Sequence, residues 1–398
     1  MRIIIKVLAT TVFLMALFGI VMVASATEKG ATTDVSQLLG SNAVRQAMWL
    51  VIALAAGLVA SHIDYELYKR PRLMLAMAVI TVVLLALVFV PGIGHKAGGS
   101  YRWINLYFFK VQPSEFAKLA MVVLTCAWVD HVGWRVQRVW EGIVWPGVAI
   151  GIIAALLLLE PDVGAAAVVL IVCGAILFAA GVKVGQLVPP GLLGVALLVL
   201  VILLIPNRRE RFFRSIDAKF GTQLASVEED QEKARKERER VRHQPEEAKL
   251  AFINGGLLGV GYMESMQKKY YLPEAHTDFI FAIVGEEFGY FASTLVVLGF
   301  LTILTCGILI SLRVPDRFGR YLAFGMTFLL IFQAGFNLIV VTDISLVTKG
   351  IALPFLSYGG TSLLASMIAI GVILNVGRAA LQCEAAQETN AFRDAVQV

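Results

Sequence analysis

The chain carries about ten blocks of mostly apolar residues, each close to the length that a helix needs to cross a membrane. A helix of about 18 or more apolar residues spans a hydrocarbon core of about 30 Å. Only helices and closed barrels satisfy their own backbone groups in that core, and the blocks lack the alternation of barrel strands. The sequence therefore predicts an all-α polytopic membrane protein. The predicted spans are residues 8–26, 44–62, 73–91, 113–130, 142–159, 163–181, 187–205, 279–312, 321–342 and 352–375.

Composition narrows the class of protein. With 58% hydrophobic and 16% charged residues, the chain lacks the polar surface of a soluble domain. The net charge of +5 suits a protein beside anionic lipid, and it does not argue for a nucleic acid partner. The span at 279–312 is longer than a crossing requires, which predicts that it tilts, kinks or begins outside the core. The cysteines show neither metal-ligand spacing nor a disulfide framework; they are Cys126, Cys173, Cys306 and Cys383.

Basic residues in the short loops predict the orientation, because cytoplasmic loops carry an excess of Lys and Arg. All of them fall on one side if the N-terminus is cytoplasmic. Both termini are then cytoplasmic, and the long loop 206–278 after the seventh span is extracytoplasmic. The first span resembles a signal peptide with Ala24–Ala26 as its cleavage site, but its longer apolar run favours a retained span. The basic residues are Arg2, Lys6, Lys69, Arg70, Arg72, Arg135, Arg138, Lys183, Arg313, Arg317, Arg320 and Arg378.

The segment 227–249 differs sharply from the rest of the chain, because nearly all of its residues are charged or polar. Glu229–Lys233 and Glu232–Lys236 are i,i+4 pairs in the order that favours a helix. We expect a solvated helix that ends near Pro245. Two roles stay open: an exposed spacer, and a docking surface for a partner.

Asp278 is the most informative polar residue. It follows the loop and directly precedes a wholly apolar run, so it lies where the loop meets the membrane. Glu286 and Glu287 follow about two turns into the span, and carboxylates at that depth are functional candidates. The glycine-dense stretch 254–261 allows a sharp turn or a close approach of the backbone to a ligand.

Further polar residues are predicted to lie on the same extracytoplasmic face and to line a cavity open to the membrane. Glu115 and Lys118 are i,i+3 neighbours at the start of the fourth span, so they share a helix face. Structural roles stay open for these residues, such as helix-dipole complementation by Glu115, a hairpin role for Glu160, or interfacial anchoring by Arg102. The other members of the set are Asp162, His276, Lys349 and Ser357.

Four motifs carry a resemblance to a known family. They are Tyr271–Gly289 (YLPEAHTDFIFAIVGEEFG), Gln112–Lys118 (QPSEFAK), Glu160–Gly164 (EPDVG) and Leu353–Gly360 (LPFLSYGG). Together they resemble the SEDS family of shape, elongation, division and sporulation proteins, which includes FtsW, RodA and SpoVE. The resemblance covers about residues 8–378, and it implies a transmembrane domain at 1–378 followed by a cytoplasmic tail at 379–398. Within the family the motifs are most similar to the division member FtsW, and the RodA and SpoVE roles stay open.

The resemblance implies a function and a site. Family members are peptidoglycan glycosyltransferases that polymerise lipid II at the outer face of the cytoplasmic membrane. They work beside a class B penicillin-binding protein, which crosslinks the strands, and for the division member beside other division proteins at the septum. The family's essential loop aspartate corresponds to Asp278, and its paired acid and lysine correspond to Glu115 and Lys118. We expect substrate contacts from Arg102, Glu115, Lys118, Glu160, Asp162, His276, Lys349 and Ser357.

This chemistry suits the residues. A sugar 4-hydroxyl of one lipid II attacks the anomeric carbon of a lipid-linked glycan, so it needs a positioned base, for which the Asp278 carboxylate is suitable. The leaving undecaprenyl diphosphate needs positive charge from Arg102, Lys118 or a divalent cation, Mg²⁺ or Mn²⁺. The sequence names no metal ligands. A P-loop is absent, as expected for a lipid-diphosphate donor.

Two departures and two other functions stay open. The loop before the last span carries Asp343, and it carries Val347 where the family usually has a Pro.

A bundle with polar residues at one side could instead flip lipid II, although paired broken midplane helices are not evident. A non-catalytic scaffold for division proteins is the third hypothesis.

Overall fold

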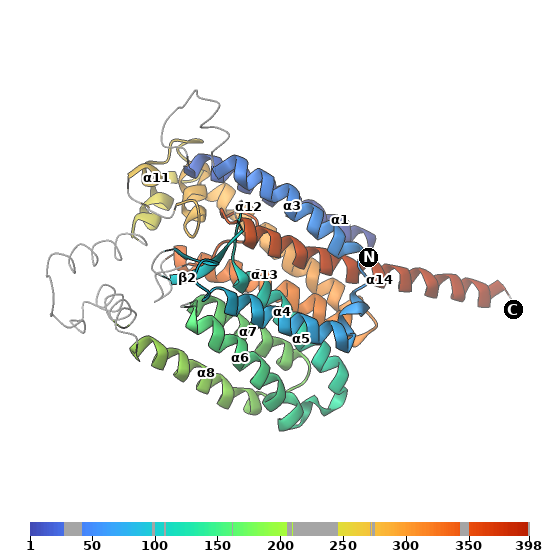
Figure 1. The fold of residues 1–398 in the computed structure, drawn as a ribbon. Helices are drawn as coiled ribbons and strands as arrows, with labels where there is room; N and C mark the ends of the chain where they lie inside the picture. Colours follow the sequence, from blue (N-terminus) through green and yellow to red (C-terminus); the bar gives the residue numbers. More distant parts are fainter. Residues whose placement is uncertain are drawn as a thin grey trace.

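The computed structural model describes residues 1–27, 42–97, 100–106, 109–160, 162–204, 209, 246–270, 272, 275–342 and 350–396. Helices run side by side through these residues as one bundle (Figure 1). Among them, seven helices are long and apolar enough to cross a membrane, and three are shorter and apolar. This confirms an all-α polytopic membrane protein. Five of the seven spans are α1 (Arg2–Thr27), α3 (Asn42–His62), α12 (Ile280–Arg313), α13 (Arg317–Val341) and the part of α14 (Gly360–Val396) up to Ala386. The other two join a helix to a short helical turn: Pro113–Gln137 contains α5 (Pro113–Val132), and Trp140–Leu159 contains α6 (Trp145–Leu159). The three shorter ones are α4 (Pro71–Leu87), α7 (Val163–Ala179) and the stretch Val184–Leu197 of α8 (Val184–Leu204).

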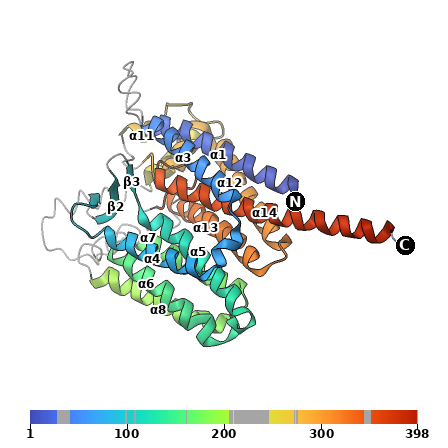
Figure 2. The same ribbon diagram turned by 45° about the vertical axis from the view of Figure 1, so that its right-hand side comes forward.

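The two chain termini lie at one end of the bundle, called here the proximal end (Figures 1 and 2). The amino group of Met1 lies 3.6 Å from Glu384 in α14. The short basic loops meet at this end as well, because the Tyr65 hydroxyl in η1 (Tyr65–Lys69) donates to Asp316 at 2.6 Å. Arg378 donates to the backbone oxygen of Ser61 at 3.2 Å. The predicted grouping of the termini with the short basic loops therefore matches the fold.

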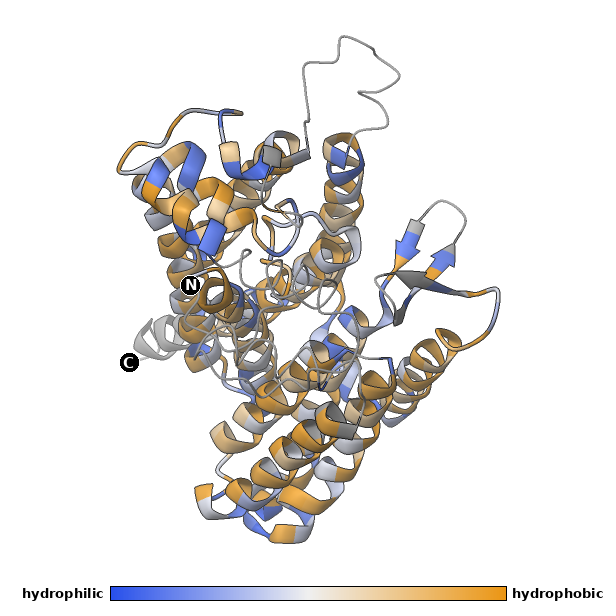
Figure 3. Ribbon diagram, turned by 90° about the vertical axis from the view of Figure 1, so that its left-hand side faces the viewer, coloured by the Kyte–Doolittle hydropathy of each residue, from blue (hydrophilic) through white to orange (hydrophobic). Residues whose placement is uncertain are grey.

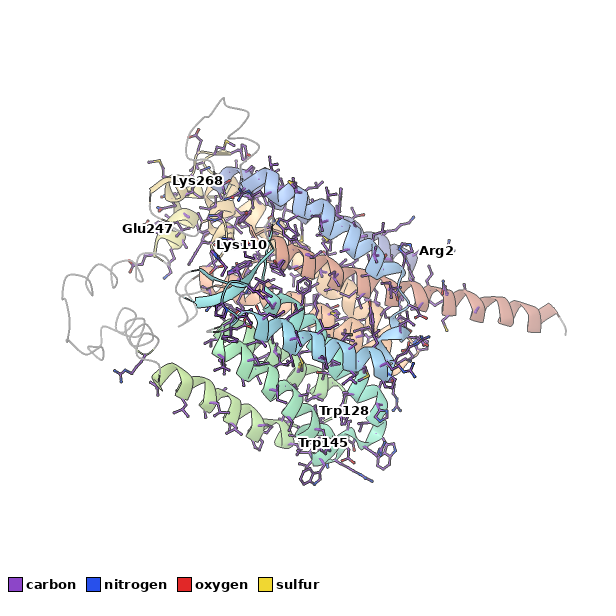
Figure 4. All side chains as sticks on the ribbon, in the orientation of Figure 1. Arg2, Lys110, Trp128, Trp145, Glu247 and Lys268 are labelled. Carbon is purple, nitrogen blue, oxygen red and sulfur yellow. The ribbon has the colours of Figure 1, made fainter. Side chains whose placement is uncertain are left out.

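The opposite, distal end carries the irregular structure. A small antiparallel sheet of β1 (Gly94–Ala97), β2 (Ser100–Leu106) and β3 (Phe109–Val111) precedes α5. This sheet was not predicted, because its strands lie in a loop between two spans and two of them are shorter than most strands. The helical stretch 246–255 and α11 (Met266–Tyr270) also lie there. In Figure 4, Lys110, Glu247 and Lys268 mark the distal end and Arg2 the proximal end.

Apolar side chains cover the helices and fill two joined cores. Seen onto the distal end, most helices are hydrophobic along their length and hydrophilic residues gather near their ends (Figure 3). One core joins α1, α3, α12, α13 and α14, and the other joins α5, α6 and α7. The helices α3 and α14 touch at a small-residue contact, where a Cβ on Gly57 would lie 2.7 Å from the Met367 oxygen. A larger side chain at Gly57 would force the two helices apart.

The long helix α12 breaks at Gly289, whose φ is 73° and ψ −171°. The glycine-dense stretch supplies the partners for the broken turn. The Val260 amide donates to the Glu286 oxygen at 2.9 Å, and the Tyr290 amide donates to the Gly256 oxygen at 2.9 Å. A positive φ costs glycine little, which explains why the break falls at Gly289. The kink expected from the length of this span is confirmed, and the glycine stretch serves this packing.

The predicted start of the last span is wrong by about two turns. Instead of beginning at 352, α14 begins at Gly360, and residues 351–359 are irregular. Phe355 is buried with a positive φ of 69°, a conformation that no helix contains. At its other end α14 continues to Val396, so the predicted cytoplasmic tail begins within the same helix.

Candidate active site

Asp278 lies at the distal end of the bundle, in the turn that leads into α12. Its backbone oxygen accepts a hydrogen bond from the Asn337 side chain of α13 at 2.8 Å. The chain that leads into α14 passes beside Asp278, because a Cβ on Gly350 would lie 3.1 Å from the Asp278 Cβ. The predicted position of Asp278, where a loop enters an apolar helix, is therefore observed, and the residue is partly buried.

The irregular segment before α14 holds the turn that carries Asp278. The Ser357 hydroxyl donates to the Thr277 oxygen at 2.6 Å and accepts from the Leu353 amide at 2.8 Å. The Tyr358 amide donates to the His276 oxygen at 2.9 Å, and the rings of His276 and Tyr358 lie 5.7 Å apart. These bonds fix the backbone of His276 and Thr277, the two residues before Asp278.

Ser357 and His276 are predicted to contact substrate, and in the structure both support the Asp278 turn. Ser357 is buried, and both of its hydrogen bonds go to the protein. His276 is partly buried, and its backbone and ring both contact Tyr358. The substrate contacts of both residues stay predictions.

A third element, α3, locks this support in place. The Gln46 side chain donates to the Ser357 oxygen at 3.1 Å and accepts from the Gly359 amide at 3.3 Å. Gln46 is 1% exposed. Both the nitrogen and the oxygen of this buried amide bond the segment 357–359 and thereby fix its backbone. Leaving either atom unpaired would cost about 1–3 kcal/mol.

Glu115 and Lys118 form a buried ion pair at the start of α5. The Lys118 Nζ lies 2.9 Å from the Glu115 Oε1, and the two residues are 3% and 8% exposed. The prediction that they share a helix face is confirmed. They line a small cavity with Gln333 of α13 and Ser366 of α14.

The side chains of α13 connect this cavity to Asp278. Gln333 lines the cavity, and Asn337, four residues later, binds the Asp278 oxygen. Residues four apart share a helix face and are separated by about 6 Å along the axis. The Asp278 turn and the Glu115–Lys118 cavity therefore contact two α13 side chains that are one helical turn apart.

Asp162 connects the starts of α5 and α7. It caps α7 by accepting from the Ala165 amide at 3.2 Å, and its other oxygen accepts from Gln112 and Ser114, each at 3.2 Å. These contacts give Asp162 a structural role at the predicted hairpin.

Glu160 is buried beside this cap. Neither of its carboxyl oxygens accepts or donates a hydrogen bond among the described residues. Burial, with a smaller contribution from Asp162, raises the pKa of the Glu160 carboxyl to about 8, although Arg102 acts to lower it. The Arg102 Nε donates to the Glu160 backbone oxygen at 3.4 Å, which connects β2 to the same corner.

A second buried ion pair lies at the distal end, and the sequence did not reveal it. The Lys268 Nζ lies 2.5 Å from the Glu287 Oε1 and also donates to the Ser25 hydroxyl at 2.6 Å. Ser25 in turn donates to Glu287 at 2.6 Å. The pair joins α1, α11 and α12.

Glu286, next to Glu287, binds the chain around α11. It accepts from the Ser265 hydroxyl and from the Met266 and Gln267 amides, at 3.2 and 3.3 Å for the two amides. Both membrane-depth carboxylates were functional candidates. In the structure they hold the segment 264–270 against the bundle.

Comparisons with known proteins identify the family. The family model described as cell cycle protein, FtsW/RodA/SpoVE, matches residues 5–382. The chain belongs to this family. Probable peptidoglycan glycosyltransferase FtsW of Trichlorobacter lovleyi is 35% identical over 93% of this chain and 92% of that protein. Stage V sporulation protein E of Bacillus subtilis is 35% identical over 84% of this chain and 87% of that protein.

Solved structures have the same fold. A chain of a peptidoglycan synthase complex, studied for its coordination of polymerization and crosslinking, has a TM-score of 0.71, 25% identity and coverage of 94% of this chain and 98% of that chain. The rod shape determining protein RodA of Thermus thermophilus has a TM-score of 0.65 at 24% identity, with coverage of 93% and 95%. This FtsW/RodA/SpoVE protein therefore has the family fold along most of its length.

Several predicted features of this FtsW/RodA/SpoVE protein lie outside the described residues. They are Lys349, both departures at Asp343 and Val347, and the two ion pairs of the charged segment. Of the charged segment 227–249, the structure describes only residues 246–249, which begin a helix. These predictions stay as they were.

The structure also adds residues that the sequence reading passed over. Gln46, Gln333 and Asn337 are polar residues within otherwise apolar helices, a pattern that marks functional positions in membrane proteins. The sequence alone therefore could have marked each of these three residues as a functional candidate. Lys268 gave no such signal, because it lies in a loop with other polar residues.

Proposed function

We propose that this protein is a peptidoglycan glycosyltransferase that polymerises lipid II, and that it serves septal synthesis in cell division. The relatives named above as FtsW support the activity and the division role. The observation that carries the proposal is the held turn of Asp278, whose backbone binds Asn337 of α13, one helical turn from Gln333 in the wall of the Glu115–Lys118 cavity.

The reaction that we assign is an inverting glycosyl transfer. Asp278 accepts the proton of the sugar 4-hydroxyl as its oxygen forms a bond to the anomeric carbon of the lipid-linked glycan. The bond from that carbon to the diphosphate oxygen breaks, and undecaprenyl diphosphate leaves with the electron pair. Arg102 and Lys118 supply positive charge toward the diphosphate, and the proton leaves Asp278 before the next cycle.

A divalent cation, Mg²⁺ or Mn²⁺, would add positive charge at the leaving diphosphate. The residues that the structure describes bring no three His, Cys, Asp or Glu side chains together in a cluster that could hold a metal.

The partners and the location follow from the same proposal. We infer a class B penicillin-binding protein that crosslinks the strands, and other division proteins at the septum. The solved synthase complex supports such a partner. We place both termini in the cytoplasm and the distal end outside, where lipid II is used.

The test is reconstitution of the purified protein in vesicles containing lipid II, with two readouts. Glycan polymer measures transferase activity, and the appearance of lipid II in the opposite leaflet measures flipping. Polymer without net translocation supports the proposal. Translocation without polymer, in the presence of a class B partner, would replace it with a lipid II flippase.

Neutralising Glu115 and Lys118 together should reduce polymerisation by about tenfold or more, because the pair lines a cavity shared with α13, the helix that binds the Asp278 backbone. A Glu115→Gln, Lys118→Met variant avoids leaving one buried charge without its partner, which would cost about 3–5 kcal/mol. Polymer yield per folded protein is the measurement. Full turnover by the double variant would leave the pair with a structural role only.

The orientation predicts which cysteines an impermeant thiol reagent reaches. Glu264 is exposed at the distal end, and native Cys383 lies in α14 beyond the proximal end. In cells with a permeable outer membrane, Glu264→Cys should be labelled, whereas Cys383 should react only after the inner membrane is opened. Labelling of Cys383 with protection of the introduced cysteine would invert the orientation. Cys126, Cys173 and Cys306 are buried and give little background.

A further inference from the structure

Asn337, near the end of α13, binds two chain segments that are far apart in the sequence. Its Nδ2 donates to the backbone oxygen of Asp278 at 2.8 Å and to that of Ile351 at 2.6 Å. An amide nitrogen carries two protons, so both are used. Because both partners are carbonyl oxygens, the atom that faces them is the nitrogen. The Oδ1 is buried and has no hydrogen-bond partner among the described residues.

One of the two bonded segments contains the candidate base, and the other passes beside it. Asp278 enters α12, and Ile351 begins the irregular chain that continues to Ser357. The residue after Asp278, Phe279, is the N-cap of α12 and has no side-chain cap. The Asn337 amide therefore supplies, from a different helix, a bond that holds the chain at the entrance of α12.

Asn337 also relates this turn to the ion-paired cavity. It is fully buried, and α13 carries Gln333 one turn earlier in the wall of the Glu115–Lys118 cavity. Both side chains belong to one rigid helix. The Asp278 backbone and the cavity wall are thus both tied to α13, at side chains one helical turn apart.

We propose that Asn337 is a positioning residue that sets the place of Asp278 relative to α13 and the Glu115–Lys118 cavity. The proposal deepens the proposed function, on which it rests for the role of Asp278 as the base. Without the two donors, the entrance of α12 and the segment at Ile351 can separate. A base misplaced by about 1 Å loses on the order of 10²-fold in rate.

The first arm of the test measures the clamp without any activity. Asn337→Leu keeps a similar volume and removes both donors. Hydrogen exchange of the backbone at 275–282 and 350–356 should become faster by about tenfold or more, as expected from the loss of a buried hydrogen bond. Asn375→Leu is the matched control, because Asn375 donates to the Ser61 oxygen at 2.8 Å and accepts from the Tyr65 amide at 3.1 Å at the proximal end. It should leave exchange at 275–282 unchanged.

The second arm measures steady-state polymerisation of lipid II. Asn337→Leu should lower kcat by roughly 10²-fold with KM within about twofold, because the base is displaced while the substrate site remains. Asn337→Gln keeps both protons on a longer side chain and should recover part of kcat. Asn375→Leu should retain kcat within about twofold, since it lies far from the reacting groups.

Each outcome decides one point. Unchanged exchange at 275–282 in Asn337→Leu overturns the clamp, and so does an equal loss of kcat in Asn375→Leu, which would indicate general destabilisation. Faster exchange with unchanged kcat shows that the bond exists but does not position the base, which also rejects the proposal. If the wild-type protein forms no polymer, the proposed function fails, and the exchange comparison still decides whether Asn337 holds the turn.

Discussion

Replacing Asp278 by Asn should abolish polymerisation of lipid II, with a loss of at least about 10²- to 10⁴-fold, the usual contribution of a general base. The substitution preserves the size of the side chain and removes only its ability to accept a proton. The turn itself should persist, because its hydrogen bonds run through backbone atoms of His276, Thr277 and Asp278. Membrane insertion and thermal stability of the purified variant should therefore remain close to wild type.

Asp64→Asn is the matched control for this experiment. Asp64 also lies in a turn before a helix, η1, where its carboxylate accepts from the Glu66 amide at 3.0 Å, but it is exposed at the proximal end. It should keep the wild-type rate. Near wild-type polymerisation by Asp278→Asn would show that another group accepts the proton, and the assignment of the base would be wrong.

Replacing Lys268 by Met should destabilise the protein by about 3–5 kcal/mol, because it leaves the Glu287 carboxylate buried without its cation. Glu287 is 0% exposed, and after the change only the Ser25 hydroxyl donates to it among the contacts seen here. Pairing the change with Glu287→Gln should restore much of the loss, since neither buried group is then charged. The free energy of unfolding in detergent, measured for both single variants and the double variant, gives the coupling.

The exposed pair of Lys69 and Glu66 provides the comparison. Their charged atoms lie 3.6 Å apart, with side chains 31% and 55% exposed. Lys69→Met should cost less than about 1 kcal/mol. A cost for Lys268→Met no larger than that of Lys69→Met would mean that the distal pair is hydrated, and that it does not tie α11 to α1 and α12.

The features that could be predicted from the sequence depend on residues that are close together in the chain. The apolar blocks located the helices because the membrane solvent fixes their length and content. The spacing of Glu115 and Lys118 predicted a shared face, and the observed ion pair follows from that spacing. The excess length of the eighth span predicted a kink, although it did not locate the kink at Gly289.

The features that could not be predicted depend on contacts between distant segments. Nothing near Lys268 in the sequence indicates Glu287 or Ser25 as its partners, because the three come from different elements. Ser357 is another example, because nothing near it in the sequence indicates its bond to the Thr277 oxygen, 80 residues away. Polar residues such as Asn337 can be singled out from sequence, but their targets require the fold.

The most direct measurement of the central claim is the formation of glycan strands from lipid II by the purified protein, with a class B penicillin-binding partner whose crosslinking site is inactivated. The partner then cannot join strands, so any polymer is uncrosslinked. The account predicts a ladder of glycan strands with the wild-type protein and none with Asp278→Asn. The absence of polymer from the correctly folded wild-type protein with its partner, or equal polymer from Asp278→Asn, would contradict it.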